Sequence, residues 1–391
     1  MLTELIDRST DLKHLRDEGY GIEIVNGFLL VNHVPYVNDR SQVAYGILVS
    51  RLDLAGNVTT KPKDHVALWT GDYPYSSNGK KLENLVNNTS ANQVIVSGLV
   101  ANISFSQKPE GGYDNYYQKM TSYIHILEGE ARAIDSSATA QTYPFVKPSN
   151  DQSVFWYEDT ASSRANIADI NDKLRLGKIA IVGLGGTGSY ILDLLAKSPV
   201  EEIHLFDGDR FLQHNAFRVP GAASEEELAE KPMKVEWLSK VYSRLRRKGI
   251  VPHPEYIDEN NVLDLSTMTF VFLCLTNGHS KRVIVDFLIG TGIPFIDAGM
   301  GLRRSDGALD GLLRVTTFIP NHSSNIYKRV PFSDGEDDEY SSNVQTADLN
   351  ALNAVLAVIK WKKITGFYVD TKQEYNSTYG VSMNLLTNDE G

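Results

Sequence analysis

The stretch Lys178-Ile-Ala-Ile-Val-Gly-Leu-Gly-Gly-Thr-Gly188 decides the fold of this chain. An apolar, β-branched run at 179–182 meets Gly183, Gly185 and Gly188, and an apolar helical pattern follows. This order predicts a strand, a glycine-rich turn and a helix. Such a unit binds phosphate, because the glycines let the backbone approach an anion and the helix N-terminus offers unpaired N–H groups.

A second apolar run, at 202–206, ends at Asp207, where folds of this kind hydrogen-bond a ribose. Strand and helix patterns alternate after it, which predicts a doubly wound, mostly parallel α/β sheet. The further predicted strands lie at 253–257, 270–275, 294–298 and 314–319. An amphipathic helix beginning near Leu349 and ending at Gly366 completes this Rossmann-like domain.

The chain is long enough for two domains with cores of their own, at 391 residues and 42% hydrophobic content. Residues 1–147 combine a short polar helix with strand patterns separated by turns, which predicts a smaller α+β domain. Residues 148–173 are polar and end in a helical pattern, so we expect a linker and a lead-in helix. Residues 174–391 form the predicted Rossmann-like domain.

Charge and cysteine content exclude several classes of protein. The net charge of −11 argues against nucleic-acid binding. The single cysteine, Cys274, excludes a disulfide framework and a four-cysteine zinc site. The sequence shows neither a signal-peptide pattern nor an apolar run of membrane-spanning length, so we expect a cytoplasmic protein without a membrane partner.

Tyrosines gather between Tyr113 and Tyr123 in the first predicted domain. A tyrosine has an apolar body and a polar tip, so this cluster fits a face that binds another protein. It equally fits the core of a small domain, which is the favoured interpretation.

A glycine-rich turn alone fits NAD, FAD or ATP. The polar residues that follow the turn must therefore indicate which of these nucleotides binds. The nearby carboxylates, amide and cations are Asp207, Asp209, Asn215, Arg218 and Lys234. Transfer of a nucleotide group needs such cations, because negative charge shifts from the α-phosphate to the leaving pyrophosphate. Hydride transfer does not need them, so an NAD- or FAD-dependent oxidoreductase is the less favoured alternative.

Residues 164–366 resemble the E1-like, or ThiF/MoeB-like, adenylyltransferases, which activate the C-terminus of ubiquitin-like and sulfur-carrier proteins. The resemblance rests on Val-Gly-Leu-Gly-Gly-Thr-Gly (182–188), Asp-Gly-Asp (207–209), Asn-x-x-Arg (215–218), Pro-Met-Lys-Val (232–235) and Leu-Asn-Ala-Leu-Asn-Ala (349–354). The N-terminal part resembles the domain that precedes ThiF modules in bacterial ubiquitin-like conjugation clusters. We therefore expect it to dock a partner.

The resemblance implies that the chain adenylates the C-terminal carboxylate of a carrier protein with ATP and Mg²⁺. Carried over by position, the residues implied to bind ATP are Gly183, Gly185, Gly186, Gly188, Asp207, Asp209, Asn215, Arg218, Lys234, Thr276 and Asn277. Arg218 and Lys234 are implied to act on the triphosphate during the reaction. Family members work as pairs of modules, so a homodimer is expected, and Arg164 is the candidate for an arginine that enters the partner's site.

Two departures from the family pattern bear on activity. Thr276 stands where the family has an aspartate that helps hold Mg²⁺, and a hydroxyl is a weaker ligand, so Asp209 and Asp297 become the candidate metal ligands. The loop near 300–345 lacks the cysteine of full E1 enzymes, and Cys274 lies in an apolar run where a thiol is inert.

The CxxC pairs of many relatives are also absent, so no zinc is expected. The expected product is an acyl-adenylate that passes to a separate E2-like protein or to another nucleophile. The alternative is a catalytically impaired E1-like scaffold that binds nucleotide or carrier without turnover.

Overall fold

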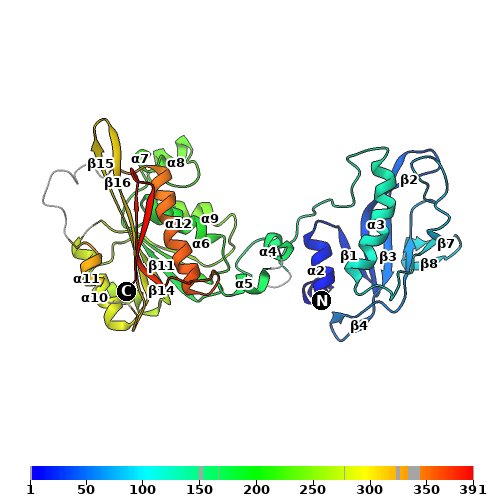
Figure 1. Cartoon of the computed structure of the whole chain (residues 1–391), viewed down its shortest axis with the longest axis horizontal. Helices are drawn as coiled ribbons and strands as arrows, with labels where there is room; N and C mark the ends of the chain where they lie inside the picture. Colours follow the sequence, from blue (N-terminus) through cyan, green and yellow to red (C-terminus); the bar gives the residue numbers. More distant parts are fainter. Residues whose placement is uncertain are drawn as a thin grey trace. The chain divides into compact units, whose positions relative to one another are not determined.

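The computed structural model describes residues 2–148, 153–165, 167–276, 278–322, 326–332 and 344–390. The chain divides into two compact units (Figure 1). The N-terminal unit comprises Met1–Asp151 and Tyr157–Ile167, and the C-terminal unit comprises Gln152–Trp156 and Ala168–Gly391. Among the described residues, no helix is both long enough and apolar enough to cross a membrane.

The N-terminal unit is built on a six-stranded antiparallel sheet, which confirms the predicted α+β class. In spatial order its strands are β1 (Ile22–Val25), β2 (Phe28–Val37), β3 (Val43–Arg51), β6 (Val66–Trp69), β10 (Ile103–Ser106) and β7 (Val86–Asn88). The unit's helices are α1 (Leu2–Arg8), α2 (Thr10–Asp17), α3 (Tyr116–Arg132) and α4 (Thr160–Arg164). Two small hairpins, β4 (Leu54–Ala55) with β5 (Val58–Thr59) and β8 (Gln93–Val96) with β9 (Leu99–Ala101), complete it.

The clustered tyrosines belong to the core of this unit. Tyr113, Tyr116 and Tyr123 are buried, and they pack with apolar residues of the sheet and of α2. Their hydroxyls are also bonded inside: Tyr113 donates to the carbonyl of Gln107 at 3.0 Å, and Tyr116 accepts from the N–H of Asp53 at 2.6 Å. The core interpretation is confirmed, and these rings do not form a docking face.

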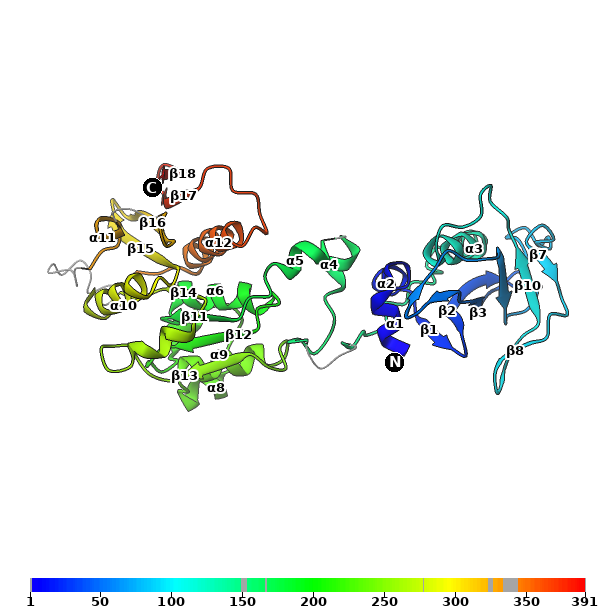
Figure 2. The same cartoon turned by 90° about the horizontal axis from the view of Figure 1, so that it is seen from below.

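The C-terminal unit contains an eight-stranded sheet, five of whose strands run parallel (Figure 2). In spatial order the parallel strands are β13 (Ile250–His253), β12 (Glu202–Phe206), β11 (Lys178–Val182), β14 (Phe270–Leu273) and β15 (Phe295–Ser305). Antiparallel strands β16 (Ala308–Phe318), β17 (Glu374–Gly380) and β18 (Leu385–Glu390) extend it. The doubly wound, mostly parallel prediction is confirmed.

Helices cover both faces of this sheet, which explains why its central strands are apolar on both sides. The helices that pack on one face are α6 (Gly186–Ala196), α9 (Lys234–Tyr242) and α12 (Ala347–Ile364). The other face carries α10 (Gly278–Thr291), α11 (Ile326–Arg329) and the 3₁₀ segment η1 (Val262–Thr267). Shorter helices α5 (Ala168–Asp172), α7 (Gln213–Ala216) and α8 (Glu225–Glu230) connect these elements.

Some boundaries differ from the predicted ones. The strand expected at 253–257 lies at 250–253, at the edge of the sheet, where Pro252 is tolerated because its nitrogen needs no partner on the open side. The strand expected at 314–319 is the second arm of a long hairpin formed by β15 and β16. Strands β17 and β18 were not predicted, because their alternation of polar and apolar residues is weak.

Arg246 ties the C-terminal end of α6 into the unit. Its Nη1 donates to the carbonyl of Ser198 at 2.8 Å, its Nη2 donates to the carbonyl of Val200, and the guanidinium lies over the ring of Phe155. Burial lowers the pKa of Arg246 to about 10. The side chain therefore satisfies buried main-chain carbonyls of the loop that follows α6, and its Nη1 also reaches the helix-terminal carbonyl of Ala196 at 3.3 Å.

Candidate nucleotide-binding site

The turn after β11 needs glycine at two positions, because other backbone atoms approach it closely there. Gly183 has φ of +94°, and a Cβ there would lie 2.5 Å from the carbonyl oxygen of Cys274. A Cβ on Gly188 would lie 1.9 Å from the carbonyl oxygen of Gly183. The turn and the first turn of α6 therefore pack in a way that excludes any side chain at either position.

Gly185 and Gly186 have different surroundings, although they are adjacent. A Cβ on Gly185, which caps the N-terminus of α6, would meet nothing within 4 Å. A Cβ on Gly186 would lie 2.0 Å from Nδ2 of Asn350, which belongs to α12. Gly185 thus faces open space beside the helix N-terminus, whereas Gly186 permits two helices to touch.

The asparagines of the 349–354 motif join α12 to its neighbours. Asn350 accepts a hydrogen bond from the Thr187 hydroxyl at 3.0 Å, and Asn353 donates to the carbonyl of Gly299 at 3.1 Å. Both asparagines are fully buried. The motif therefore holds α12 against α6 and β15, behind the glycine turn.

Asp207, at the end of β12, is buried and hydrogen-bonded to the glycine turn. One carboxylate oxygen accepts from the N–H of Leu184 at 2.7 Å, and the other accepts from the N–H of Asp209 at 2.8 Å. Each oxygen retains a second lone pair, so the carboxylate can still accept a hydrogen bond from a ligand. Its orientation is set by the same turn that would hold a phosphate.

Lys234, the first residue of α9, places its ammonium group between two carboxylates. Nζ lies 2.5 Å from Oδ2 of Asp209 and 3.5 Å from Oδ1 of Asp207. The hydroxyl of Tyr256 donates to the other oxygen of Asp209. Burial would raise the pKa of Asp209, but the hydrogen bonds from Lys234 and Tyr256 lower it below its usual value.

Tyr256 also belongs to this cluster, although it was not predicted from the sequence. Its ring lies against Gly208, where a Cβ would come within 2.7 Å of it, and its hydroxyl bonds Asp209. That hydrogen bond, together with partial burial, raises the pKa of Tyr256 to about 12. The available signal was its place just after β13, at the same sheet edge as Asp207.

Asn215 and Arg218 lie on and after α7, close to this cluster. Asn215 is buried, and its side-chain oxygen accepts from the N–H of Leu212 at 2.9 Å, so it caps the helix. Burial lowers the pKa of Arg218, and the charge of Asp209 opposes that shift. Nε of Arg218 is buried and has no hydrogen-bond partner in the described part of the chain.

Asp297 and Thr276 lie near neighbouring strand ends with different environments. Asp297 on β15 pairs in register with Leu273 of β14, and Thr276 follows β14 with its side chain exposed. Asp297 is fully buried, 2.6 Å from Nη2 of Arg314 and 3.2 Å from Nζ of Lys281. Two cations therefore already neutralise it.

Three further residues were named from the sequence: Cys274, Arg164 and Asn277. The pKa of the Cys274 thiol is raised by burial and by the charge of Asp297, so it stays protonated at neutral pH. Arg164 lies on α4 of the N-terminal unit, exposed, with its guanidinium 5.9 Å from the ring centre of Tyr143. Asn277 lies outside the described residues.

The structure thus brings Asp207, Asp209, Lys234 and Arg218 together beside the glycine turn. Among the described residues, no group of three His, Cys, Asp or Glu side chains could hold a metal ion by itself. A divalent ion here would need phosphate oxygens among its ligands, which is how Mg²⁺ usually binds in nucleotide sites.

Comparisons with known proteins agree with this arrangement. Residues 160–390 match the ThiF family, and residues 10–160 match a domain of unknown function, DUF6791. A search of curated proteins finds none that matches.

Solved structures similar to the chain include Escherichia coli MccB with ATP, at 17% identity and a TM-score of 0.46, covering 59% of this chain and 69% of that one. MccB from the same organism with MccA-N7isoASN has 16% identity and a TM-score of 0.45, with the same shares covered. PaaA has 19% identity and a TM-score of 0.44, covering 57% of this chain and 75% of that one. The ThiF match spans more than half of the residues, and the chain therefore belongs to the ThiF family of E1-like adenylating enzymes.

Proposed function

We propose that this chain uses ATP to adenylate the C-terminal carboxylate of a ubiquitin-like or sulfur-carrier protein. The observation that carries the proposal is Arg218, whose buried Nε lacks a partner among the described residues beside Asp209 and Lys234. A buried unpaired donor on a cation is costly unless a ligand supplies an acceptor. Two cations next to a glycine-rich turn suit a triphosphate.

In this reaction a carboxylate oxygen of the carrier attacks the α-phosphorus of ATP, and an O–P bond forms. The bond between the α-phosphorus and the bridging oxygen breaks, and pyrophosphate leaves with the electron pair. Lys234 and Arg218 would meet the charge that develops on pyrophosphate. The N–H groups at the start of α6 and the open space at Gly185 would hold the phosphates, and Asp207 would accept from the ribose.

Mg²⁺ bound to the triphosphate would supply further charge neutralisation. Asp209 is the carboxylate that fits best as its protein ligand, because its side chain is half exposed and adjoins Lys234. Lys234 must leave Asp209 for this to happen, and a phosphate oxygen offers it an equivalent partner. Asp297 fits less well, because Arg314 and Lys281 already occupy its oxygens.

We further propose that the product is a free acyl-adenylate, which a separate E2-like protein or another nucleophile consumes. The raised pKa of Cys274 supports this step, since a protonated, partly buried thiol is a poor nucleophile. The Cys274→Ser variant should therefore retain adenylation. A carrier thioester on wild-type chain that disappears in this variant would contradict the proposal.

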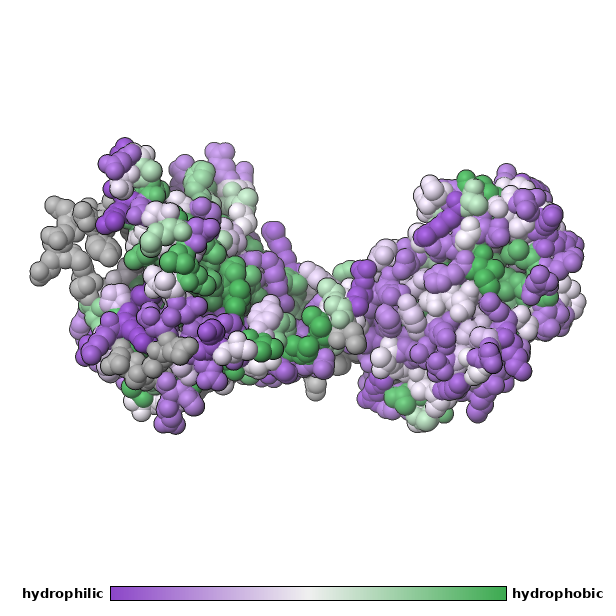
Figure 3. Space-filling model, in the orientation of Figure 1, coloured by the Kyte–Doolittle hydropathy of each residue, from purple (hydrophilic) through white to green (hydrophobic). Residues whose placement is uncertain are grey.

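A homodimer is part of the proposal. Hydrophobic side chains gather on the surface over α12 (Figure 3), where Val355 and Ile359 are each 38% exposed. An apolar helix face of this kind often contacts another protein. Light scattering at micromolar concentration should give the mass of two chains, and Ile359→Lys should shift it toward one.

ATP–pyrophosphate exchange tests the adenylation step directly. Radiolabel should enter ATP only when the chain is mixed with its carrier protein, and Lys234→Ala should abolish the exchange. Small carrier proteins ending in Gly-Gly are the panel to screen. Exchange that proceeds equally without any carrier, or with its C-terminal carboxylate amidated, would contradict a reaction at that carboxylate.

The second candidate function is an E1-like scaffold without turnover. The observation that favours it is Thr276, an exposed hydroxyl residue at the position where a carboxylate would help hold Mg²⁺. Thr276→Asp would add a Mg²⁺ ligand, and Thr276→Asn has nearly the same shape without the charge. An adenylyltransferase weakened at this position should gain exchange in the Asp variant alone, most visibly at low Mg²⁺. A scaffold should bind ATP and show no exchange in wild type or in either variant.

A further inference from the structure

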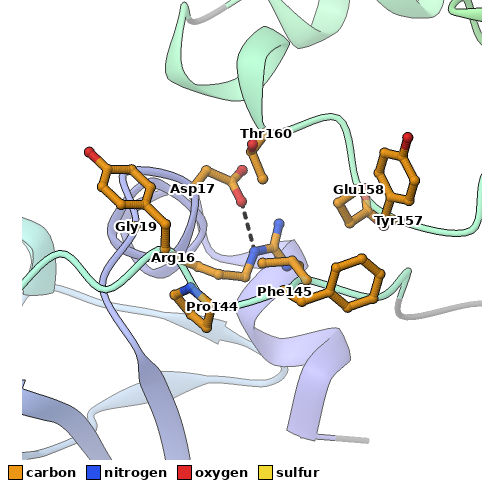
Figure 4. Close-up of a pocket in the computed structure, with 10 residues that line it drawn as sticks. Arg16, Asp17, Gly19, Pro144, Phe145, Tyr157, Glu158 and Thr160 are labelled. Carbon is orange, nitrogen blue, oxygen red and sulfur yellow. Dashed lines mark hydrogen bonds and ion pairs between the residues drawn. The ribbon is translucent and has the colours of Figure 1, made fainter.

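A cavity of about 210 Å³ lies within the N-terminal unit, at the C-terminal end of α2 (Figure 4). Its floor is Arg16, Asp17 and Gly19, and its two walls are residues 143–146 and 157–160. The walls are joined by a hydrogen bond from the N–H of Glu158 to the carbonyl of Val146 at 3.1 Å. The cavity is therefore a formed feature of this unit and not a gap between side chains of one loop.

The floor carries buried polar atoms that lack hydrogen-bond partners. Nε of Arg16 donates to Oδ1 of Asp17 at 2.8 Å, and Nη1 donates to Asp7 of α1. Nη2 of Arg16 and Oδ2 of Asp17 are buried and unpartnered in the described part of the chain, and both residues are more than nine-tenths buried. Figure 4 shows both groups pointing toward the space below Thr160 and beside Glu158.

The charge of this cavity is negative. Asp7 and Asp17 already neutralise Arg16, so an entering anion would meet the carboxylate of Asp17 and the carboxyl group of Glu158 without an unpaired cation among the described residues of the floor. Burial, followed by repulsion from Asp7, raises the pKa of Glu158, while Arg16 and Lys13 oppose the shift and Asp17 adds to it. A carboxyl group held in this way gains a favourable partner when a cation binds.

Aromatic rings surround the entrance. Phe145 and Tyr157 are exposed and lie edge to face with their ring centres 6.0 Å apart. Tyr143, on the same wall, packs on Gly19 and already carries the guanidinium of Arg164 at 5.9 Å. Aromatic faces attract cations, so the rings of Phe145 and Tyr157, which carry no such cation from the described residues, favour a positively charged group at the rim.

We propose that this cavity binds a lysine or arginine side chain of a partner protein, with Asp17 and Glu158 accepting hydrogen bonds from its cationic group. Arg16 donates from Nη2 to a main-chain carbonyl next to that side chain. This second contact selects a peptide-borne cation, because a free amine would leave the buried Nη2 without an acceptor. The site lies within the N-terminal unit, and the inference does not depend on adenylation by the C-terminal unit.

Titration calorimetry with the full chain and two tripeptides tests the site. The probes are acetyl-Gly-Lys-Gly-amide and its norleucine counterpart, which has an apolar side chain of similar length. The lysine tripeptide should bind, and the norleucine tripeptide should bind at least about tenfold more weakly, as expected for loss of charge-assisted hydrogen bonds. Equal affinity for both tripeptides, or tighter binding of the norleucine tripeptide, would overturn the proposal.

Variants locate the binding. Glu158→Gln should weaken the lysine tripeptide about tenfold or more, and Phe145→Ala should weaken it less. Glu110→Gln, an exposed position in the same unit, is the matched charge control and should leave the affinity unchanged. Equal affinities in Glu158→Gln and Glu110→Gln would place any binding elsewhere and overturn the assignment. Circular dichroism melting checks that each variant is folded.

Two further experiments test the site independently: the pH dependence of tripeptide binding and the binding of methylammonium. Affinity for the lysine tripeptide should rise as the pH rises through the raised pKa of Glu158, because the ionised carboxylate is the form that binds a cation. In the Glu158→Gln variant the affinity should no longer depend on pH in this range. Methylammonium should bind more weakly than the tripeptide. Methylammonium binding of equal strength would contradict a peptide-borne ligand. Lys234→Ala should leave all these results unchanged, which separates this inference from the proposed adenylation.

Discussion

Lys234 and Asp209 are joined twice: Nζ of Lys234 lies 2.5 Å from Oδ2 of Asp209, and the N–H of Lys234 donates to the main-chain carbonyl of Asp209 at 2.9 Å. The backbone bond fixes the start of α9 beside the end of β12, and the ion pair keeps the ammonium at the glycine turn. A phosphate that enters this turn therefore meets a lysine whose backbone and side chain are both held in place by Asp209.

Lys234→Met should weaken ATP binding by roughly tenfold or more, because a charge-assisted hydrogen bond contributes about 1.5–3 kcal/mol. Titration calorimetry with ATP and Mg²⁺ measures the change. Lys197→Met is the matched control, since Lys197 pairs with Asp193 on the exposed surface of the same unit. Affinities like that of wild type in Lys234→Met would remove Lys234 from the site.

Alanine at two adjacent glycines should have opposite effects. Gly186→Ala should destabilise the fold by about 1–3 kcal/mol, because its Cβ meets the buried amide of Asn350. Gly185→Ala should leave the melting temperature nearly unchanged and should weaken ATP binding, since its Cβ would enter the open space at the helix N-terminus. Thermal melts and calorimetry separate the two. The reverse pattern would mean that Gly186, and not Gly185, faces the ligand.

Arg246→Ala should destabilise the C-terminal unit by about 3 kcal/mol or more, because several buried carbonyls lose their donors. Arg246→Lys should recover little of this loss, since one ammonium cannot reproduce the planar fork. Arg244→Ala should change stability by less than about 0.5 kcal/mol, as its side chain is exposed. Guanidinium unfolding measures all three, and equal effects at 244 and 246 would contradict the capping role.

The pKa of Asp209 predicts a dependence of stability on pH. This carboxylate titrates below its ordinary value of 3.8 in the folded chain, so the unfolded chain binds the proton more readily. Its contribution to stability is present above pH 4 and should be lost as the pH falls through the lowered pKa. Asp209→Asn should therefore be less stable than wild type near pH 6, and the difference should shrink toward pH 3. A difference that stays constant over this range would show that the Lys234 pair contributes nothing.

Local patterns determined much of the fold and part of the site. The run at 179–182, the turn glycines and Asp207 could be assigned from the sequence because strand, turn and helix signals act between residues close together in the chain. The existence of helix α12 and its end at Gly366, which has φ of +75°, were readable for the same reason. Its predicted apolar face was wrong, because Val355 and Ile359 are exposed whereas Asn350 and Asn353 are buried. The family resemblance rests on short motifs of the same kind, such as Asn-x-x-Arg at 215–218 and Pro-Met-Lys-Val at 232–235.

Only the tertiary structure decided which of these residues meet. Gly186 had no visible packing role until Asn350, more than 160 positions away, was placed against it. Asp297 had the chemistry of a metal ligand, but Lys281 and Arg314 reach it from α10 and β16 and neutralise it. Tyr256 joins Asp209, and Arg16 meets Asp7 of another helix, through contacts that no periodicity in the sequence records. Such pairings depend on how the elements pack, and packing brings together side chains whose separation along the chain carries no signal.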